Sequence, residues 1–265
     1  MYIQRERKEY VPYLKAIIES GKLPSSVYKH TKISEKLYNA LTKSELWFSS
    51  PLSFNDPFDC QINDATEWTP EIIKNYIEFA NKNVGGSVDA DEVAEREKQY
   101  PGSFAKFFTG NYRKVLGESG VACFITKPDN LLLWSHYSNA HKGICLKYDI
   151  TKHYELFAQT MKMDYTNEYP KVDFITERAH GYIKKAIFTK SKVWEYEDEI
   201  RTIQRKPGSY SINKECLQEI IFGCKTDPND ITEIRQIIKT SQYPNVVFKQ
   251  VTLQPNSFDI KINKI

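Results

Sequence analysis

Residues 132–149 read LLWSHYSNAHKGICLKYD. This stretch places His136, His141, Trp134 and Tyr137 directly before a strand-like apolar segment. Aromatic surface, hydroxyl groups and imidazoles that titrate near neutral pH are typical of a small-ligand site. A second interpretation is structural, because in a helix the two aromatic side chains would be core anchors while the histidines cap the helix or face solvent. The stretch therefore predicts either a ligand site or a packed helix, followed by a buried strand.

Apolar and alternating runs predict further strands and helices on both sides of this stretch. The expected strands cover residues 27–31, 46–51, 121–125, 144–148, 163–165, 199–204, 219–223 and 246–248. The expected helices cover residues 9–20, 34–41, 69–117, 173–187 and 230–240. Gly21 is expected to end the first helix, Ser34 to cap the second and Pro70 to begin the third. These elements interleave without an internal repeat, so we expect an α+β fold with a mixed, mostly antiparallel sheet.

The length of the chain predicts one large domain. Its 265 residues, 40% of them hydrophobic, are enough to bury a full core. We expect an N-terminal helix within residues 1–24 and a single α+β domain over residues 25–265, with a helical insertion at about 69–117. Residues 83–97 of this insertion are polar and contain glycine, so they are either a solvated connector or a lid or partner surface.

The composition of the chain limits the compartments and the partners that we expect for it. A net charge of +3 gives no global field for nucleic-acid binding. Five cysteines without a C-x-x-C pair favour free thiols in a reducing compartment, with Cys123 and Cys145 buried in strands. There is no run of about 18 apolar residues, and the mixed-charge start lacks a signal-peptide core. We therefore expect a cytoplasmic protein without a membrane partner.

The acidic segment 194–201, WEYEDEIR, is the second informative feature. In an extended strand, Glu195, Glu197, Glu199 and Arg201 would share one face, where neighbouring carboxylates need an arginine, a ligand or a cation. The structural alternative is a charged strand edge with an ion pair between Glu199 and Arg201. In a helix the same residues would instead form a solvated acidic turn.

The sequence Asn55-Asp56-Pro57 predicts a fixed turn. A residue before proline is kept out of the α region, and an aspartate in such a turn accepts hydrogen bonds from nearby backbone N–H groups. We expect the Asp56 carboxylate to accept bonds from the backbone or from Arg201.

Taken together, these motifs resemble a bacterial family, domain-of-unknown-function family 2971, over roughly residues 25–225. A relative of that family, an abortive-infection protein with a similar Trp-His-Tyr segment, implies phage defence or a toxin–antitoxin system as the context. The matching motifs are Tyr28-Lys29, Phe48-Ser49, Asn55-Asp56-Pro57-Phe58, Cys123-Phe124 and residues 134–143 and 194–201.

The order of the polar motifs also resembles ADP-ribosyltransferase-like folds. That resemblance implies NAD as a substrate, a carboxylate from Glu199 or Glu197 that stabilises an oxocarbenium-like centre, and ribose contacts from His30 and Ser49. It also implies stacking of nicotinamide on an aromatic ring. The first strand lacks the arginine of the arginine-serine-glutamate version. The catalytic candidates are Glu199, Glu197 and His136, and the binding candidates are His30, Ser49, Asn55, Asp56, Trp134, Ser135, Tyr137, His141 and Arg201.

This interpretation predicts that the candidate residues converge on one cleft, which binds a small nucleotide, with a protein or nucleic acid as the acceptor of any transfer. No metal is expected for that chemistry. One alternative is a metal-dependent phosphodiesterase or nuclease that uses Asp56, His136, His141 and a glutamate, although the two histidines are five residues apart and align poorly on a helix. The other is a non-enzymatic recognition or antitoxin-like module with the aromatic residues as core and interface anchors. The sequence contains no phosphate-binding glycine loop, nucleophile elbow or zinc signature.

Overall fold

The computed structural model describes residues 2–177 and 179–265, so residue 1 of the expected N-terminal segment and residue 178 of the expected helix 173–187 lie outside the described residues. The chain forms two compact units. The sheet unit comprises Met1–Ser50, Ser119–Met163 and Val193–Ile265, and the helical unit comprises Pro51–Glu118 and Asp164–Lys192. The helices expected in the insertion fall within the helical unit. The expected division into one domain with an insertion stays a prediction.

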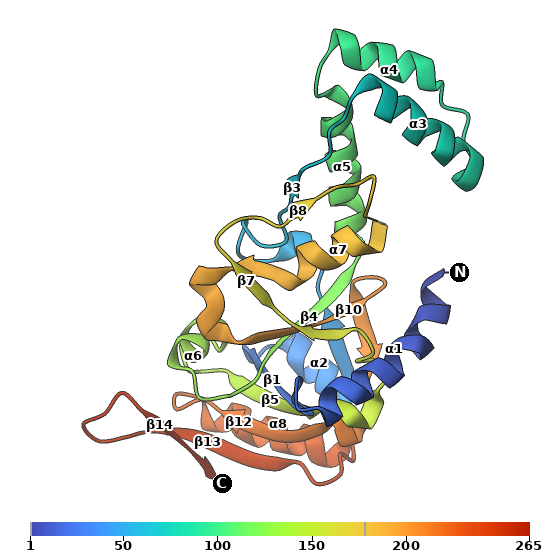
Figure 1. Ribbon diagram of the computed structural model, residues 1–265. Helices are drawn as coiled ribbons and strands as arrows, with labels where there is room; N and C mark the ends of the chain where they lie inside the picture. The colour runs from blue at the N-terminus through green and yellow to red at the C-terminus, as the bar shows by residue number, and fades with distance from the viewer. Residues whose placement is uncertain (1, 178) are drawn as a thin grey trace. The chain divides into compact units, whose positions relative to one another are not determined.

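The sheet unit is built on an eight-stranded sheet (Figure 1). In spatial order the strands are β14 (Ile260–Lys264), β13 (Val247–Leu253), β12 (Leu217–Phe222), β5 (Ile144–Asp149), β1 (Ser26–Thr31), β4 (Gly120–Ile125), β10 (Glu199–Gln204) and β6 (Thr160–Lys162). Only the β12–β13 pair is parallel. The prediction of an α+β fold with a mixed, mostly antiparallel sheet is therefore confirmed.

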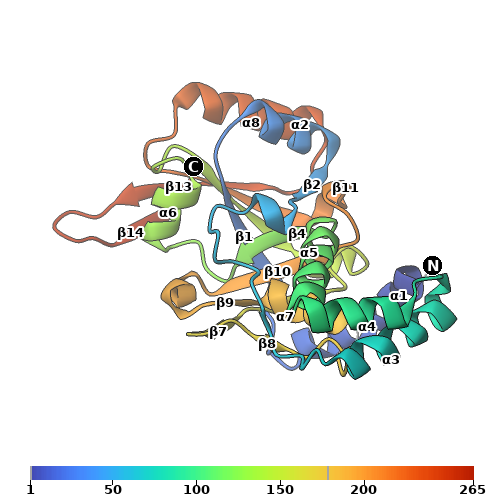
Figure 2. The same ribbon diagram turned by 90° about the horizontal axis from the view of Figure 1, so that it is seen from above.

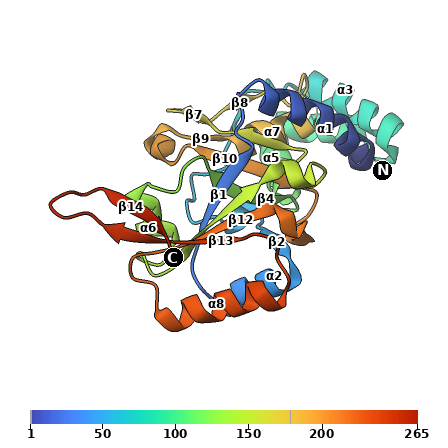
Figure 3. The ribbon, with the colours of Figure 1, turned by 90° about the horizontal axis from the view of Figure 1, so that it is seen from below.

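One face of this sheet carries the main apolar core. Successive side chains in a strand point to opposite faces, so Val27, Phe124 and Leu146 lie on the core face while their neighbours lie on the other. Three helices bury apolar side chains in this core, namely α1 (Tyr2–Glu19), α2 (Glu35–Lys43) and α8 (Pro228–Thr240). Helices α2 and α8 lie side by side in Figure 2 and Figure 3. Two expected helix ends are confirmed. Ser34 caps α2, and Gly21 has a left-handed φ of 73° just after α1.

The opposite face, which we call the site face, carries polar side chains. Helix α6 (Leu131–Tyr137) packs on it through Trp134, which is fully buried in a small cluster with Cys145, Ile221 and Val251. The short ribbon of β2 (Glu45–Phe48) and β11 (Gly208–Ser211) and the 3₁₀ turns η3 (Ile150–His153) and η5 (Lys214–Cys216) complete the sheet unit.

Two sequence-based expectations in the sheet unit are wrong. The acidic segment is not one strand, because η4 (Lys192–Glu197) is a 3₁₀ helix and β10 begins only at Glu199. Asp198 between them has a left-handed φ of 44°, which breaks the strand geometry. Glu195 and Glu197 therefore do not share a strand face with Glu199. No strand was expected at β14, but this segment pairs with β13 and forms a C-terminal hairpin.

The helical unit contains the helices expected over residues 69–117. They are α3 (Pro70–Ala80), the π-helical turn η2 (Asn81–Gly85), α4 (Ala90–Gln99) and α5 (Ser103–Gly117), followed after β7 (Asp164–Thr166) and β8 (Lys171–Val172) by α7 (Ala179–Phe188) and β9 (Thr189–Ser191). The two-stranded pairs β3 (Asn63–Asp64) with β8 and β7 with β9 are parallel, and η1 (Pro51–Ser53) begins the unit. Pro70 begins α3 as expected.

A buried carboxylate joins α4 to α5. Glu97 accepts hydrogen bonds from the backbone N–H groups of Gly102 (2.5 Å) and Phe104 (2.8 Å) and from the Ser103 hydroxyl (2.9 Å). Burial alone would raise the pKa of Glu97, but these bonds outweigh it and the pKa is lowered. Most of the polar stretch 83–97 is thus ordered as helix α4.

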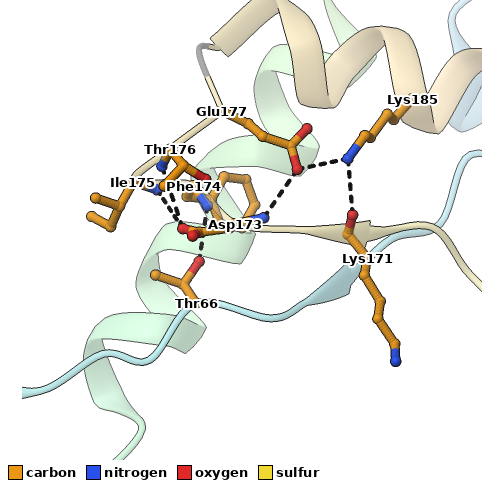
Figure 4. Close-up of polar contacts among 8 residues, drawn as sticks. All are labelled: Thr66, Lys171, Asp173, Phe174, Ile175, Thr176, Glu177 and Lys185. Atoms are coloured by element: carbon orange, nitrogen blue, oxygen red, sulfur yellow. Dashed lines mark hydrogen bonds and ion pairs between the residues drawn. The ribbon is translucent and has the colours of Figure 1, made fainter.

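Residues 173–177 form a turn rather than the first part of the expected helix 173–187 (Figure 4). The Asp173 carboxylate accepts from the N–H groups of Ile175 (2.9 Å) and Thr176 (3.4 Å), while Phe174 N–H donates to Thr66 Oγ1 (2.9 Å). An aspartate that satisfies its own local backbone competes with helix formation, so α7 begins only at Ala179.

Two glycines predict substitutions that change the free energy of unfolding in opposite directions. A Cβ at Gly223 would collide with the backbone carbonyl of His141, so Gly223→Ala should lower the free energy of unfolding by about 1–3 kcal/mol. A Cβ at Gly110, inside α5, would meet nothing within 4 Å, so Gly110→Ala should raise it by about 0.5–1 kcal/mol. Urea denaturation of both variants measures the two effects. Equal stability of Gly223→Ala and the wild type would contradict the close approach.

Candidate functional site

Strand register places His30, Glu199 and Arg201 on the site face. Residues paired directly across antiparallel strands point to the same side, and Tyr28 pairs with Ile125, which pairs with Glu199. His30 and Arg201 follow Tyr28 and Glu199 by two residues, so they share that face. Only β4 lies between β1 and β10, which puts the two strands about 10 Å apart.

Ser138 sets the hydrogen bonding of His30 Nδ1. The fully buried Ser138 hydroxyl lies 3.3 Å from the carbonyl oxygen of Ile144, to which it can donate, and 2.9 Å from His30 Nδ1. A hydroxyl has one proton, so Ser138 Oγ accepts from His30 when it donates to Ile144, and the proton of a neutral His30 is then on Nδ1 with Nε2 as a hydrogen-bond acceptor. If Ser138 donates to Nδ1 instead, the proton of the ring is on Nε2.

The second ring nitrogen of His30 is buried without a partner. His30 Nε2 forms no hydrogen bond to any group in the described part of the chain. The ring meets Trp134 edge to face, with centroids 4.6 Å apart and an interplanar angle of 89°. Burial, reinforced by the neighbouring His141, lowers the pKa of His30 from 6.5 to about 3, so the ring is neutral at pH 7. An unsatisfied buried acceptor costs about 1–3 kcal/mol.

The segment after α6 is strained. Asn139, Ala140 and His141 have φ values of 47°, 52° and 68°, a left-handed conformation that costs about 1–2 kcal/mol per residue in residues with a Cβ. The segment is clamped at both sides, because His141 N–H donates to Trp134 O (3.1 Å) and Lys225 N–H donates to His141 O (3.1 Å). Backbone strain of this kind clusters at functional sites.

This strained segment presents a second imidazole to Trp134. The ring of His141 stacks on that of Trp134 with centroids 6.5 Å apart, and its Nε2 lies 3.1 Å from Ser135 Oγ. Its Nδ1 is buried and has no hydrogen-bond partner among the residues that the structure describes. Burial, and to a smaller extent Lys225, lowers the pKa of His141. Trp134 thus holds two imidazoles, which supports the interpretation that this tryptophan is a core anchor.

Glu199 and Arg201 form a buried bidentate pair. Arg201 Nε donates to Glu199 Oε1 (2.7 Å) and Nη2 donates to Oε2 (3.1 Å), and their side chains are 1% and 4% exposed respectively. The ion pair expected from the sequence is confirmed. The thiol of Cys123, which pairs with Arg201 across the strands, has a raised pKa because of burial and then of Glu199, so it stays protonated.

A second set of contacts joins η4 to α6. The Tyr137 hydroxyl donates to Glu197 Oε1 (2.9 Å), and Asn130 Nδ2 donates to the carbonyl oxygen of Tyr196 (2.8 Å). The Thr126 hydroxyl donates to the carboxylate of Asp198. Tyr137 and Glu197 were predicted to share a site, and the structure brings them together.

Four predicted site residues have other surroundings. Ser49 bridges Val121, four residues along β4 from Ile125 and so about 13 Å from the Glu199 pairing position, and its hydroxyl accepts from Trp47 Nε1 (3.1 Å). His136 is exposed, on the side of α6 away from Trp134. Asn55 and Asp56 belong to the helical unit, where Asp56 accepts from Phe58 N–H (2.9 Å) as its turn requires. Their place beside Glu199 stays a prediction.

Sequence reasoning missed Ser138. This residue contacts His30, 108 residues away, and its position at the end of an aromatic helix gives no local signal for that contact. Lys29, which was named as part of a motif, lies on the core face beside Phe124 rather than on the site face. It donates to the carbonyl oxygen of Cys123 (3.1 Å), and burial lowers its pKa.

The segment of the chain that contains Glu197, Glu199 and the strained residues matches the model of a known family. The model of the family described as "Protein of unknown function (DUF2971)" matches residues 133–202. These residues belong to the DUF2971 family. The resemblance inferred from the motifs is thereby confirmed, and the matched segment runs from α6 to β10, so it contains the strained segment and both glutamates of the site. No curated protein and no solved structure matches the chain significantly.

Among residues 2–177 and 179–265, no three or more histidine, cysteine, aspartate or glutamate side chains gather as they would around a metal ion. Within the same residues, no helix has both the length and the apolar character needed to span a bilayer.

The low pKa of His30 predicts a pH-dependent stability. Because His30 takes up a proton near pH 6.5 when unfolded and only near pH 3 when folded, unfolding binds a proton in this window. Stability relative to a His30→Gln variant should therefore fall as the pH is lowered from 6.5 to 3, with a slope approaching about 1.4 kcal/mol per pH unit. Urea titrations across this range test it, and a difference independent of pH would contradict the assignment of a buried neutral ring.

Proposed function

We propose that this protein binds NAD at the site face and cleaves its nicotinamide glycosidic bond, as an ADP-ribosyltransferase or NAD glycohydrolase does. The observation that carries the proposal is the buried, unpartnered Nε2 of His30. With the proton of the ring on Nδ1 this atom is an acceptor, and a ribose hydroxyl or a carboxamide N–H is a donor that would satisfy it. The ribose contact expected of His30 from the sequence would supply this atom with a hydrogen-bond donor.

Stacking on nicotinamide belongs to Tyr137 rather than Trp134. Trp134 is enclosed between two imidazoles and the apolar cluster, with no exposed surface left for a ligand. Tyr137 is partly exposed, and its hydrogen bond to Glu197 keeps the ring beside the acidic segment. We assign Trp134 to the support of the two imidazoles.

The transition state needs a negative charge near the anomeric carbon. When the C–N bond breaks, its electron pair leaves with nicotinamide, which becomes neutral, and positive charge develops on the ribose. Glu199 supplies the carboxylate, because its two hydrogen bonds from the Arg201 guanidinium fix its orientation. Glu199 is 4% exposed, so NAD has to displace the groups that lie over this carboxylate.

The reaction then ends in one of two ways. Water adds to the ribose cation and loses a proton, which gives hydrolysis, or a nucleophilic group of a protein or nucleic acid adds in its place and loses its own proton, which gives transfer. His30 is neutral and would act in binding rather than in proton transfer.

The decisive variant is Glu199→Gln. The substitution keeps the shape and removes the charge, so nicotinamide release should be abolished while NAD binding stays within about tenfold, because the charge acts on the transition state. Release is followed by chromatography, and binding by calorimetry. Since the variant also removes the charge that pairs with buried Arg201, a thermal unfolding curve of each preparation verifies that the protein is folded.

Glu197→Gln is the matched control, because it changes the neighbouring carboxylate, whose Oε1 accepts a hydrogen bond from the neutral Tyr137 hydroxyl. It should retain most of the release seen with the wild type. If Glu197→Gln abolishes release and Glu199→Gln does not, the roles are reversed. If the wild type binds no NAD, the proposed function is wrong.

A further inference from the structure

The helical unit contains a preformed cavity of about 560 Å³ among α3, α4, α5 and α7. Its wall is mainly aromatic, with Tyr76, Phe104, Phe108, Tyr112 and Tyr182 among the lining residues. A largely apolar hollow of this size with a few polar groups is typical of a small-molecule site. All of the lining residues belong to the helical unit, so the cavity is separate from the NAD site proposed above.

The wall is organised before any ligand binds. The rings of Tyr76 and Phe104 lie 6.3 Å apart, those of Phe104 and Phe108 6.1 Å apart, and those of Tyr112 and Tyr182 5.4 Å apart. The hydrogen bonds that Glu97 accepts join α4 to the start of α5. A salt bridge of 2.6 Å between Lys74 and Asp91 joins α3 to α4. Rings packed on each other lose little freedom on binding, which favours affinity.

A polar group at one end of this wall lacks a partner. The Tyr112 side chain is 3% exposed, and its hydroxyl forms no hydrogen bond with any residue that the structure describes. Burial raises the pKa of Tyr112, so the hydroxyl keeps its proton. A buried donor without an acceptor is unfavourable, and a ligand oxygen or ring nitrogen would remove the deficit.

A cation lines the same cavity near its other end. Arg96 is exposed, and no described side chain forms an ion pair with its guanidinium. It lies in α4 next to Glu97, which binds the N–H of Phe104 at the start of α5. Tyr112 is eight residues further along α5, a rise of about 12 Å. The cavity therefore offers a cation and a buried donor at the two ends of an aromatic wall.

We propose that this cavity binds an amphipathic organic carboxylate, with the carboxylate at Arg96, an apolar body about 12 Å long against the aromatic rings, and a hydrogen-bond acceptor at Tyr112. Arginine and carboxylate form paired charge-assisted hydrogen bonds, which gives the ligand its charge. The volume and the apolar wall give it its body. This binding site belongs to the helical unit and takes no part in the glycosidic-bond chemistry proposed for the sheet unit.

The test uses the full-length protein and a dansyl-labelled undecanoate, whose emission rises in an apolar site. Its amide-type linkage offers the acceptor for Tyr112. The probe should bind, unlabelled dodecanoate should displace it, and dodecanol, which has the same body without the charge, should displace it at least tenfold more weakly. Equal displacement by dodecanol and dodecanoate would overturn the carboxylate assignment.

Variants locate the site. Arg96→Gln should weaken probe binding about tenfold, whereas Arg113→Gln, an exposed arginine of α5 that does not line the cavity, should leave it unchanged. Asn111→Trp, at an exposed position in the lining, should fill the cavity and abolish binding. Tyr112→Phe removes an unsatisfied hydroxyl, so the unliganded protein should be as stable as before or slightly more stable. The same variant should bind the probe more weakly. Unchanged binding in Asn111→Trp would overturn the site.

A second copy of the chain is the competing occupant. Sedimentation of the wild type and Asn111→Trp at several concentrations distinguishes it. A monomeric wild type that binds the probe supports the proposal, whereas a dimer that Asn111→Trp dissociates, without probe binding by either protein, would overturn it.

Discussion

The hydrogen-bond chain from His30 through Ser138 to the carbonyl oxygen of Ile144 is the constraint on which the candidate site depends. When the fully buried Ser138 hydroxyl donates to this carbonyl oxygen, it accepts from His30, and the proton of that ring is held at Nδ1. The remaining nitrogen is then a buried acceptor that the chain itself does not satisfy. A folded protein that keeps such a group at a cost of about 1–3 kcal/mol has a use for it, and ligand binding is the use that fits its chemistry.

The backbone around this chain is arranged to keep it in place. Three left-handed residues after Ser138 carry strain, and Gly143 follows them just before β5, where a Cβ would collide with the carbonyl of Thr31. The strained segment is held by bonds to α6 on one side and to the end of β12 on the other. On the same sheet face, the bidentate bonds between Glu199 and Arg201 fix a carboxylate about two strands away. Rigid support on both sides is what a site needs when its groups act by position and charge.

Much of the fold could be predicted from the sequence, because strand and helix patterns are local. Ser34, Gly21 and Pro70 act at the ends of helices as their side chains dictate, and the strands with β-branched or apolar runs were found. The failures have local causes too. Asp198 takes a left-handed conformation that divides the acidic segment, and Asp173 binds its own backbone and delays α7. In the site, Glu199 with Arg201 and Tyr137 with Glu197 were predictable as pairs, whereas the contact of His30 with Ser138 joins residues 108 positions apart and depends on the sheet register.

The most direct test of this account is ¹⁵N NMR of the histidine side chains, with the His30 signals identified by their loss in a His30→Gln variant. At pH 7 without ligand, the account predicts a neutral ring with the proton on Nδ1 and a bare Nε2, and a shift of the Nε2 signal toward a hydrogen-bonded acceptor when NAD is added. A proton on Nε2 in the free protein, or an Nε2 signal that saturating NAD leaves unchanged, would contradict it.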